Sequence, residues 1–240
     1  AAAGQGVATR TGRRITVGRA LRRRLAVAAV ALVGLLGVAG TGYGFNPGST
    51  LSALDVQGIS RVSFNTTMAA CSAGLAALFI IYFRGKTWDL AFTVNGFLGG
   101  LVAITCPCYW VSPAGAFWIG IVAAFVVVYV ADLLEHLRID DPIGAVAAHG
   151  MSGVWGTLML GFLTVPELAD NLATGTGGLL YGGGLHQLGV QALGLASVGA
   201  FTFTASFLVL WLMDRAIGIR TEPEVETTRL GGNLSAMYYA

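Results

Sequence analysis

Charged residues are scarce in this chain of 240 residues. Acidic and basic residues together make up 11% of it, whereas hydrophobic residues make up 55%. This composition is typical of a membrane protein rather than of a water-soluble domain. The net charge of +2 at pH 7 comes without a basic cluster of the kind that binds DNA or RNA, so no nucleic-acid partner is expected.

Cysteine is also scarce. Cys71, Cys106 and Cys108 are too few for a disulfide framework, and all three lie in apolar surroundings. A structural zinc site requires four ligands, normally with Cys-x-x-Cys spacing, and Cys106-Pro107-Cys108 has no further His or Cys close behind it. We therefore interpret the cysteines as small apolar residues and expect no metal and no cofactor.

Six apolar stretches are long enough to cross a hydrocarbon core, which takes about 20 residues at helical rise. They are Leu25–Phe45, Val62–Phe83, Leu90–Val111, Pro113–Leu134, Pro142–Val165 and Gln187–Ile217. The sequence therefore predicts an all-α fold, a polytopic membrane bundle of six transmembrane helices. We expect it to comprise a basic, poorly ordered N-terminal segment at 1–24, the membrane domain at 25–217 and a C-terminal tail at 218–240.

Basic residues gather on one side of the predicted bundle. Of the 14 Lys and Arg residues, 13 precede the first span, lie at the end of the last span or after it, or lie in loops of the same side, and only Arg61 lies on the other side. Lys and Arg accumulate on the cytoplasmic side of membrane proteins. This asymmetry predicts an even number of spans, both termini in the cytoplasm and a multi-pass location in the cell membrane.

The N-terminal region is open to a second interpretation. Arg22, Arg23 and Arg24, followed by an apolar run with small residues near Gly40, also fit a secretory signal peptide. The apolar run continues to Phe45 without a polar mature start, which favours a membrane span. The chain begins without methionine, so we expect a fragment or a processed product.

Glycines recur three or four residues apart in the predicted spans, for example at Gly96, Gly99 and Gly100 and again at Gly150, Gly153, Gly156 and Gly161. Small residues at this spacing let membrane helices approach closely. We expect these glycines to serve helix packing. The run Gly182–Gly184, between two apolar stretches, predicts a turn instead.

One ionisable residue lies inside an apolar stretch: His149, in the segment DDPIGAVAAHG from Asp140 to Gly150. Ionisable groups at membrane depth are costly, and those that persist usually face a bundle interior or a solute pathway. Depth alone leaves a pathway residue and a buried structural histidine equally open. Asp140 and Asp141 precede Pro142 at a predicted helix start, where carboxylates favour the positive end of the helix dipole, so we assign them an architectural role.

Five motifs resemble a known family. They are GYGFNPGS at 42–49, the pair Asn65-Thr66 with Ala69 and Ala70 behind it, NGFLGGLVAIT at 95–105, DDPIGAVAAHG with GVWGTL behind it, and LLYGGGLHQLGVQALG at 179–194. In this order and spacing they resemble the second half of ammonium transporters of the Amt/Mep/Rh type. The resemblance covers roughly residues 42 to 220.

The resemblance implies a fold and a function. Members of this family have eleven membrane helices in two inverted halves around a narrow pore, and they assemble as homotrimers. This chain is similar to the sixth to eleventh helices, so the expected function is transport of ammonium or ammonia. Phe45 resembles the aromatic gate at the outer mouth, Ser49 the hydroxyl that accepts a hydrogen bond from ammonium, and His149 the second of two pore histidines.

These implied roles are physically reasonable. An ammonium ion entering an apolar channel would lose hydration worth tens of kcal/mol in an idealised medium of low dielectric constant, so a pathway must replace the water or remove the charge. An aromatic face and a hydroxyl can hold the cation, and a histidine can take up or relay its proton. Packing for Phe45 and a turn for Ser49 are the ordinary alternatives.

Two departures from the family pattern limit the resemblance. The stretch VGLLGVAGTGYG stands where the family usually has tryptophans, which leaves the outer vestibule altered. The tail keeps Glu222, Glu224 and Glu226, but the aspartate and histidine that usually follow are replaced around Gly231 and Gly232. Contact with a PII-type regulator is therefore in doubt.

Two other classes of function are alternatives for this sequence. A serine hydrolase would need Ser49 and His149 within hydrogen-bond reach, but the first lies near the predicted outer surface and the second in the opposite half of its crossing. We therefore expect no enzyme. A non-transporting role is a stronger alternative: a half-transporter could act as an ammonium sensor, or as a subunit that needs a partner with the first five helices.

Overall fold

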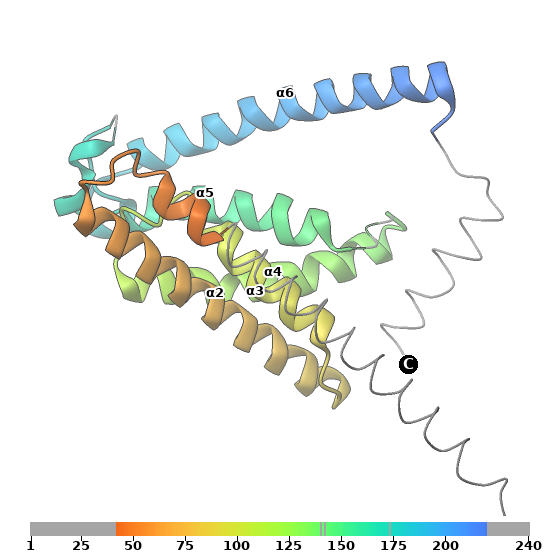
Figure 1. Ribbon diagram of the computed structural model, residues 1–240, viewed down its shortest axis with the longest axis horizontal. Helices are drawn as coiled ribbons and strands as arrows, with labels where there is room; N and C mark the ends of the chain where they lie inside the picture. Colours follow the sequence, from red (N-terminus) through yellow and green to blue (C-terminus); the bar gives the residue numbers. More distant parts are fainter. Residues whose placement is uncertain (1–41, 140, 142, 173, 220–240) are drawn as a thin grey trace, which may run out of the picture. The chain divides into compact units, whose positions relative to one another are not determined.

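Every regular element of the chain, as far as the structure describes it, is a helix. The computed structural model describes residues 42–139, 141, 143–172 and 174–219 (Figure 1). Residues 42–48 are helical. The elements that follow are α2 (Val56–Gly85), α3 (Leu90–Thr105), α4 (Pro113–His136), η1 (Val146–Met151), α5 (Ser152–Leu163), η2 (Pro166–Asn171), η3 (Leu179–Tyr181) and α6 (His186–Ile217). The all-α prediction is confirmed.

Four helical runs are long and apolar enough to cross a membrane: α2, α4, the continuous run Val146–Leu163 formed by η1 and α5, and α6. The helix α3 is apolar but has only 16 residues. Of the first predicted span, Leu25–Phe45, only residues 42–45 are described. The segment 1–24, Asp140, Pro142 and the tail from residue 220, with its three glutamates, also lie outside the described residues.

The predicted third span, Leu90–Val111, is too long. The helix α3 ends at Thr105, and the chain then turns around Pro107, whose carbonyl oxygen accepts hydrogen bonds from the amides of Trp110 and Val111 at 2.9 and 3.2 Å. Proline has no amide hydrogen to continue the helical pattern. Because the turn residues are apolar, hydropathy alone could not separate them from the helix.

Side-chain caps fix where several helices begin. Asp55 accepts a hydrogen bond from the amide of Gly58 at 2.9 Å at the start of α2, and Asp89 accepts one from the amide of Phe92 at 2.9 Å at the start of α3. Ser112 caps α4, with Pro113 in its first turn. These are ordinary N-caps. The cap at Asp55 starts α2 six residues before the predicted boundary at Val62.

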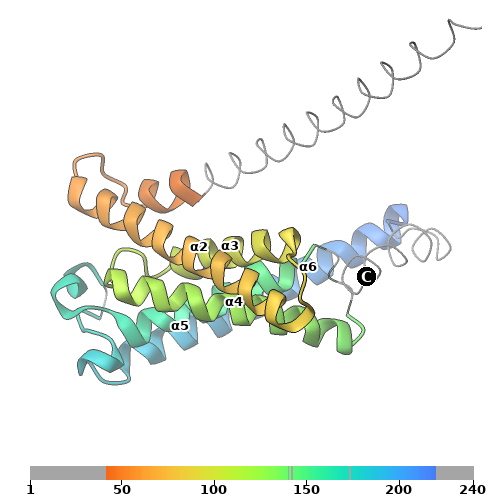
Figure 2. The same ribbon diagram turned by 90° about the horizontal axis from the view of Figure 1, so that it is seen from below.

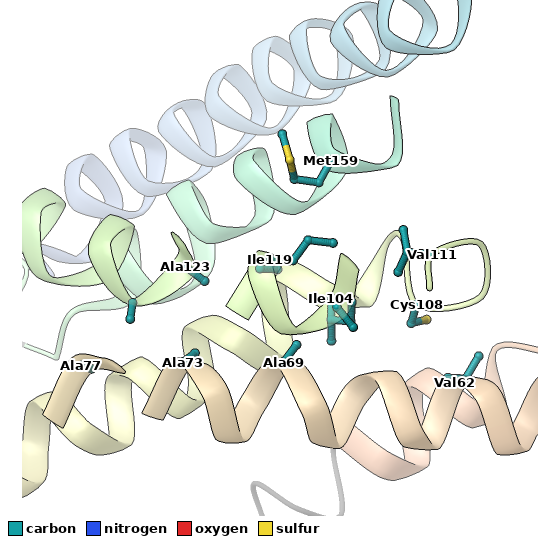
Figure 3. Packing of buried hydrophobic residues seen from close by; sticks show 13 residues of the cluster. Val62, Ala69, Ala73, Ala77, Ile104, Cys108, Val111, Ile119, Ala123 and Met159 are labelled. Carbon is teal, nitrogen blue, oxygen red and sulfur yellow. The ribbon is translucent and has the colours of Figure 1, made fainter. Parts of the chain in front are cut away.

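Small residues bring α2, α3, α4 and α5 close together. Ala69, Ala73 and Ala77 lie in a row along α2 and face the core, with Ile104 and Ile119 opposite (Figure 3). A Cβ atom added to Gly100 of α3 would lie 2.5 Å from the carbonyl oxygen of Ala69, and one added to Gly156 of α5 would lie 1.9 Å from that of Ala103.

The glycine prediction is therefore confirmed for Gly96, Gly99, Gly100, Gly156 and Gly161, where an added Cβ atom would have a neighbour within 2.6 Å. It is wrong for Gly150 and Gly153, where the nearest atoms would be 3.8 and 3.7 Å away, an ordinary contact. Gly182 and Gly184 have φ angles of 81° and 73°, so the predicted turn is confirmed.

The bundle has two distinct ends (Figure 2). At one end, the start of α2 meets the connection between α3 and α4: the Tyr109 hydroxyl donates to Asp55 at 3.1 Å, and the Asn65 amide donates to the carbonyl oxygen of Val111 at 2.9 Å. At the other end, Arg84 of α2 pairs with Asp132 of α4 at 2.7 Å. The helices α2 and α4 therefore run in the same direction, and α3, which connects them, runs in the opposite direction.

Basic residues in the described part are distributed unequally between these two ends. Arg84 and Lys86 lie at the end of α2, Arg138 follows α4, and Arg215 lies in the last turn of α6. Arg61 lies near the opposite end, with its guanidinium 5.3 Å from the ring centre of Tyr109. The charge asymmetry seen in the sequence is thus an asymmetry between the ends of the bundle.

Candidate functional site

His149 lies in a distorted turn at the start of the helical run Val146–Leu163. Residues Val146–Met151 form the π-helix η1, which continues directly into α5. The π-helix is rare and frequently marks functional sites. His149 is the fourth residue of the run Val146–Leu163, so it lies near the start of this helix.

The two sides of η1 differ. Ala147 and Ala148 are buried, and η1 packs against α3 and α4. Val146, His149 and Met151 are exposed. The imidazole therefore belongs to the side of η1 that its own bundle leaves open.

Asp141 holds the start of this helix. Its carboxylate oxygens accept hydrogen bonds from the amides of Ala145 at 2.7 Å, Val146 at 2.9 Å and Ala147 at 3.4 Å. Three amides that have no partner within the helix are thereby satisfied. The architectural role predicted for Asp141 agrees with this geometry; the sequence could not indicate how many amides it binds.

Ser49 lies in an exposed turn directly after the helical residues 42–48. Its amide donates to the carbonyl oxygen of Asn46 at 3.2 Å, and the hydroxyl of Thr50 donates to that of Pro47 at 2.9 Å. Phe45 belongs to the helical residues and is 63% exposed. Both predicted residues are thus accessible.

Asn46 anchors the turn that carries Ser49, and sequence reasoning missed it. Its side chain is 3% exposed, and its amide nitrogen donates to the hydroxyl of Thr66 on α2 at 3.2 Å. Both residues stand in motifs quoted for the family resemblance. A buried asparagine such as Asn46 needs a polar partner. The polar pair Asn65-Thr66 in an apolar stretch was therefore the feature of the sequence that could have indicated this contact.

Ser49 and His149 belong to opposite ends of the bundle. Ser49 precedes α2, whose start contacts the connection between α3 and α4, whereas η1 follows the end of α4 (Figure 1). A serine nucleophile and its histidine base need to lie about 2.6–3.2 Å apart. This arrangement gives no support to the hydrolase alternative. Among the described residues there is also no group of three or more His, Cys, Asp or Glu able to hold a metal ion.

An all-helical bundle with membrane-length apolar helices and an ionisable residue on one of them is typical of membrane transport proteins. The profile of the Ammonium Transporter Family matches residues 1–234. The chain belongs to the ammonium transporter family. Its relatives are transporters and not enzymes, in agreement with the expectation from sequence.

Individual relatives agree with this membership. The ammonium transporter Amt2 of Archaeoglobus fulgidus is 38% identical over 189 residues, which cover 77% of this chain and 39% of the relative. Ammonium transporter 1 member 2 of Oryza sativa is 34% identical over 210 residues, covering 79% of this chain and 42% of the relative. The chain thus spans about two fifths of the length of these relatives.

Solved structures give the same result. A protein named as a sensor Amt protein superposes with a TM-score of 0.67 at 34% identity and covers 78% of this chain and 44% of its own. Mep2 of Saccharomyces cerevisiae superposes with a TM-score of 0.69 at 27% identity and covers 79% of this chain and 43% of its own. The helical arrangement is therefore that of one part of an Amt/Mep transporter.

Proposed function

We propose that this chain forms one wall of a transmembrane pathway for ammonium or ammonia, with His149 facing that pathway. The observation that carries the proposal is the exposure of His149 on a π-helical turn within a membrane-length helix. An imidazole facing lipid would be costly. An imidazole facing a solute pathway can accept or donate a proton near neutral pH.

Transport would begin with recruitment of the cation at the outer mouth, with the separate roles for Phe45 and Ser49 that the family resemblance implies. An aromatic face attracts a cation within about 6 Å of the ring centre, and a hydroxyl oxygen can accept a hydrogen bond from it. Both side chains are exposed. Beyond the outer mouth the ion transfers its proton to the His149 imidazole, which takes it up or relays it, and uncharged ammonia crosses the apolar section.

The pathway would need a second wall. The chain covers 39% of the Amt2 relative, and the side of η1 that bears His149 is not covered by α3 or α4. We therefore propose that helices equivalent to the missing first five complete the pore, either on a longer chain or on a partner. The protein would be a multi-pass cell-membrane homotrimer with both ends of this chain in the cytoplasm.

A sensor role is the second candidate. One solved structure with this fold is named as a sensor Amt protein, and a chain of this length could bind ammonium without passing it on. The tail departs from the pattern usual for contact with a PII-type regulator, so this partner stays in doubt in either case.

Uptake of labelled methylammonium into vesicles separates these candidates. The chain is reconstituted alone and then with a separately expressed first half taken from a relative. Flux only in the second case supports a pore-forming subunit. Retained ammonium binding without flux in either case supports a sensor.

Substitution of single histidines then tests the pore assignment. Where flux occurs, His149→Ala should abolish most of it, because no other described residue on the open side of η1 can exchange a proton. The matched control is His186→Ala, which removes an exposed histidine at the first residue of α6 and should leave flux unchanged. Equal flux in the two variants would remove His149 from the pathway.

A further inference from the structure

We infer that Asp141 is a positioning residue for His149: its carboxylate holds the π-helical turn η1 and thereby sets the direction of the imidazole. This inference rests on the role proposed for His149 in the pathway. It concerns a side chain that the sequence assigned only to the start of a helix.

The geometry differs from that of an ordinary N-cap. Asp55 and Asp89 each accept one hydrogen bond from a helix amide, from Gly58 and Phe92, both at 2.9 Å. The two oxygens of Asp141 together accept three, from consecutive residues that end two positions before His149. A carboxylate bound in this way fixes the orientation of a whole turn, and its charge favours the positive end of the helix dipole.

The turn is held at its other end by Ser152. The Ser152 hydroxyl is buried and donates to the carbonyl oxygen of Ala147 at 3.1 Å, five residues earlier, while its amide donates to the carbonyl oxygen of His149. The packing against α3 is close, since a Cβ atom added to Gly99 would lie 3.1 Å from the Ser152 hydroxyl oxygen. His149 therefore lies between two fixed points.

The approach to the turn is fixed as well. Gly144 has a φ angle of 70°, which glycine adopts readily, and its amide donates to the carbonyl oxygen of Asp141 at 3.0 Å. The side-chain amide of Asn95 on α3 donates to the carbonyl oxygen of Ile143 at 3.4 Å. The segment before η1 is thus attached to α3, so the position of Asp141 relative to α3 is fixed.

The π-helical turn η1 holds more residues than an α-helical turn, so it changes the face of the helix on which each later residue lies. If the carboxylate is removed, residues 145–147 can relax toward the α-helical pattern, because the amides that Asp141 binds are then free to find other partners. The imidazole would rotate away from its present direction. To isolate this effect, a substitution of Asp141 must keep a side chain that caps the helix but remove the second carboxylate oxygen.

The test uses Asp141→Ser in the full chain in lipid nanodiscs, with isotope-labelled histidine observed by NMR. The chain has three histidines, so His136→Gln and His186→Gln identify the His149 signal. Serine caps a helix about as well as aspartate, but it offers one oxygen. The matched control is Asp89→Ser, which makes the same exchange at the start of α3.

The expected result is that Asp141→Ser shifts or splits the His149 ring signal by more than its linewidth, while Asp89→Ser leaves it in place. Ser152→Ala, which releases the other end of the turn and leaves the cap intact, should move the same signal. An unmoved signal in both Asp141→Ser and Ser152→Ala would overturn the inference and leave Asp141 a simple cap.

The flux measurement is kept separate from this test. With the first half present, Asp141→Ser should lower methylammonium flux at least about tenfold, since misplacement by an ångström can reduce rates by about a hundredfold. Moved NMR signals without any flux in the unsubstituted protein would retain the positioning role and reject the proposed transport. Unmoved signals with normal flux would reject the positioning role of Asp141 and retain the proposed transport.

Discussion

Replacing Gly156 by alanine should destabilise the chain, because the added methyl group has no space. Its Cβ atom would lie 1.9 Å from the carbonyl oxygen of Ala103 and 2.7 Å from the Cα atom of the same residue. These are backbone atoms of α3, so α3 and α5 must separate by about 1.5 Å to restore an ordinary contact. Overpacking of this kind costs about 1–3 kcal/mol.

A favourable term opposes this cost, because alanine stabilises a helix by up to about 1 kcal/mol relative to glycine. The net loss expected for Gly156→Ala is therefore up to about 2 kcal/mol in the free energy of unfolding. Gly194→Ala on α6 is the matched control, since an added Cβ atom there would have no neighbour within 4 Å. It should leave stability unchanged or raise it by up to about 1 kcal/mol.

Reversible unfolding of the purified chain in mixed micelles, followed by circular dichroism, measures both values. If Gly156→Ala proves as stable as Gly194→Ala, then α3 and α5 are not in backbone contact, and the close-packing account of the glycines is wrong. A loss in both variants would instead show that α6 packs against a surface within the isolated chain.

Three further outcomes follow from the described contacts. Asn65→Leu should reduce the unfolding free energy in the same assay by about 2 kcal/mol, because a fully buried amide that donates to two carbonyl oxygens at 2.9 Å is lost. Asp132→Asn should cost at most about 1 kcal/mol, and less at high salt, because its ion pair with Arg84 has side chains 30% and 45% exposed; unfolding at two salt concentrations checks this. A lipid-soluble maleimide should modify exposed Cys71 but not buried Cys108 until the chain is unfolded, as measured by mass spectrometry.

Hydropathy predicted the helices of this fold well because their length reports the thickness of the hydrocarbon core. The predicted span from Pro113 begins at that residue in the structure, where Ser112 and Pro113 form a recognisable helix start. The end of α3 was missed because the turn at Cys106–Val111 is as apolar as the helix before it. Hydropathy depends on which side chains are present, so it cannot show where the backbone turns.

The candidate site was predictable in part. His149 stands out in the sequence because an ionisable group in an apolar stretch is costly. Its π-helical setting depends on the hydrogen bonds of Asp141 and Ser152, which join residues within one short segment in a pattern that composition does not reveal. The bond between Asn46 and Thr66 spans twenty residues and requires the fold to bring them together.

The central claim is that His149 faces a solute pathway and not lipid, and thiol accessibility tests it most directly. His149→Cys and, as a control on exposed α6, Phe207→Cys are introduced into a chain whose three native cysteines are replaced by alanine, in membranes with the first half present. A small charged methanethiosulfonate should modify the thiol at position 149, ammonium should slow that modification, and the thiol at 207 should stay unmodified because lipid excludes the charge. Failure of the reagent to reach position 149, or a rate there that ammonium does not change, would contradict the account.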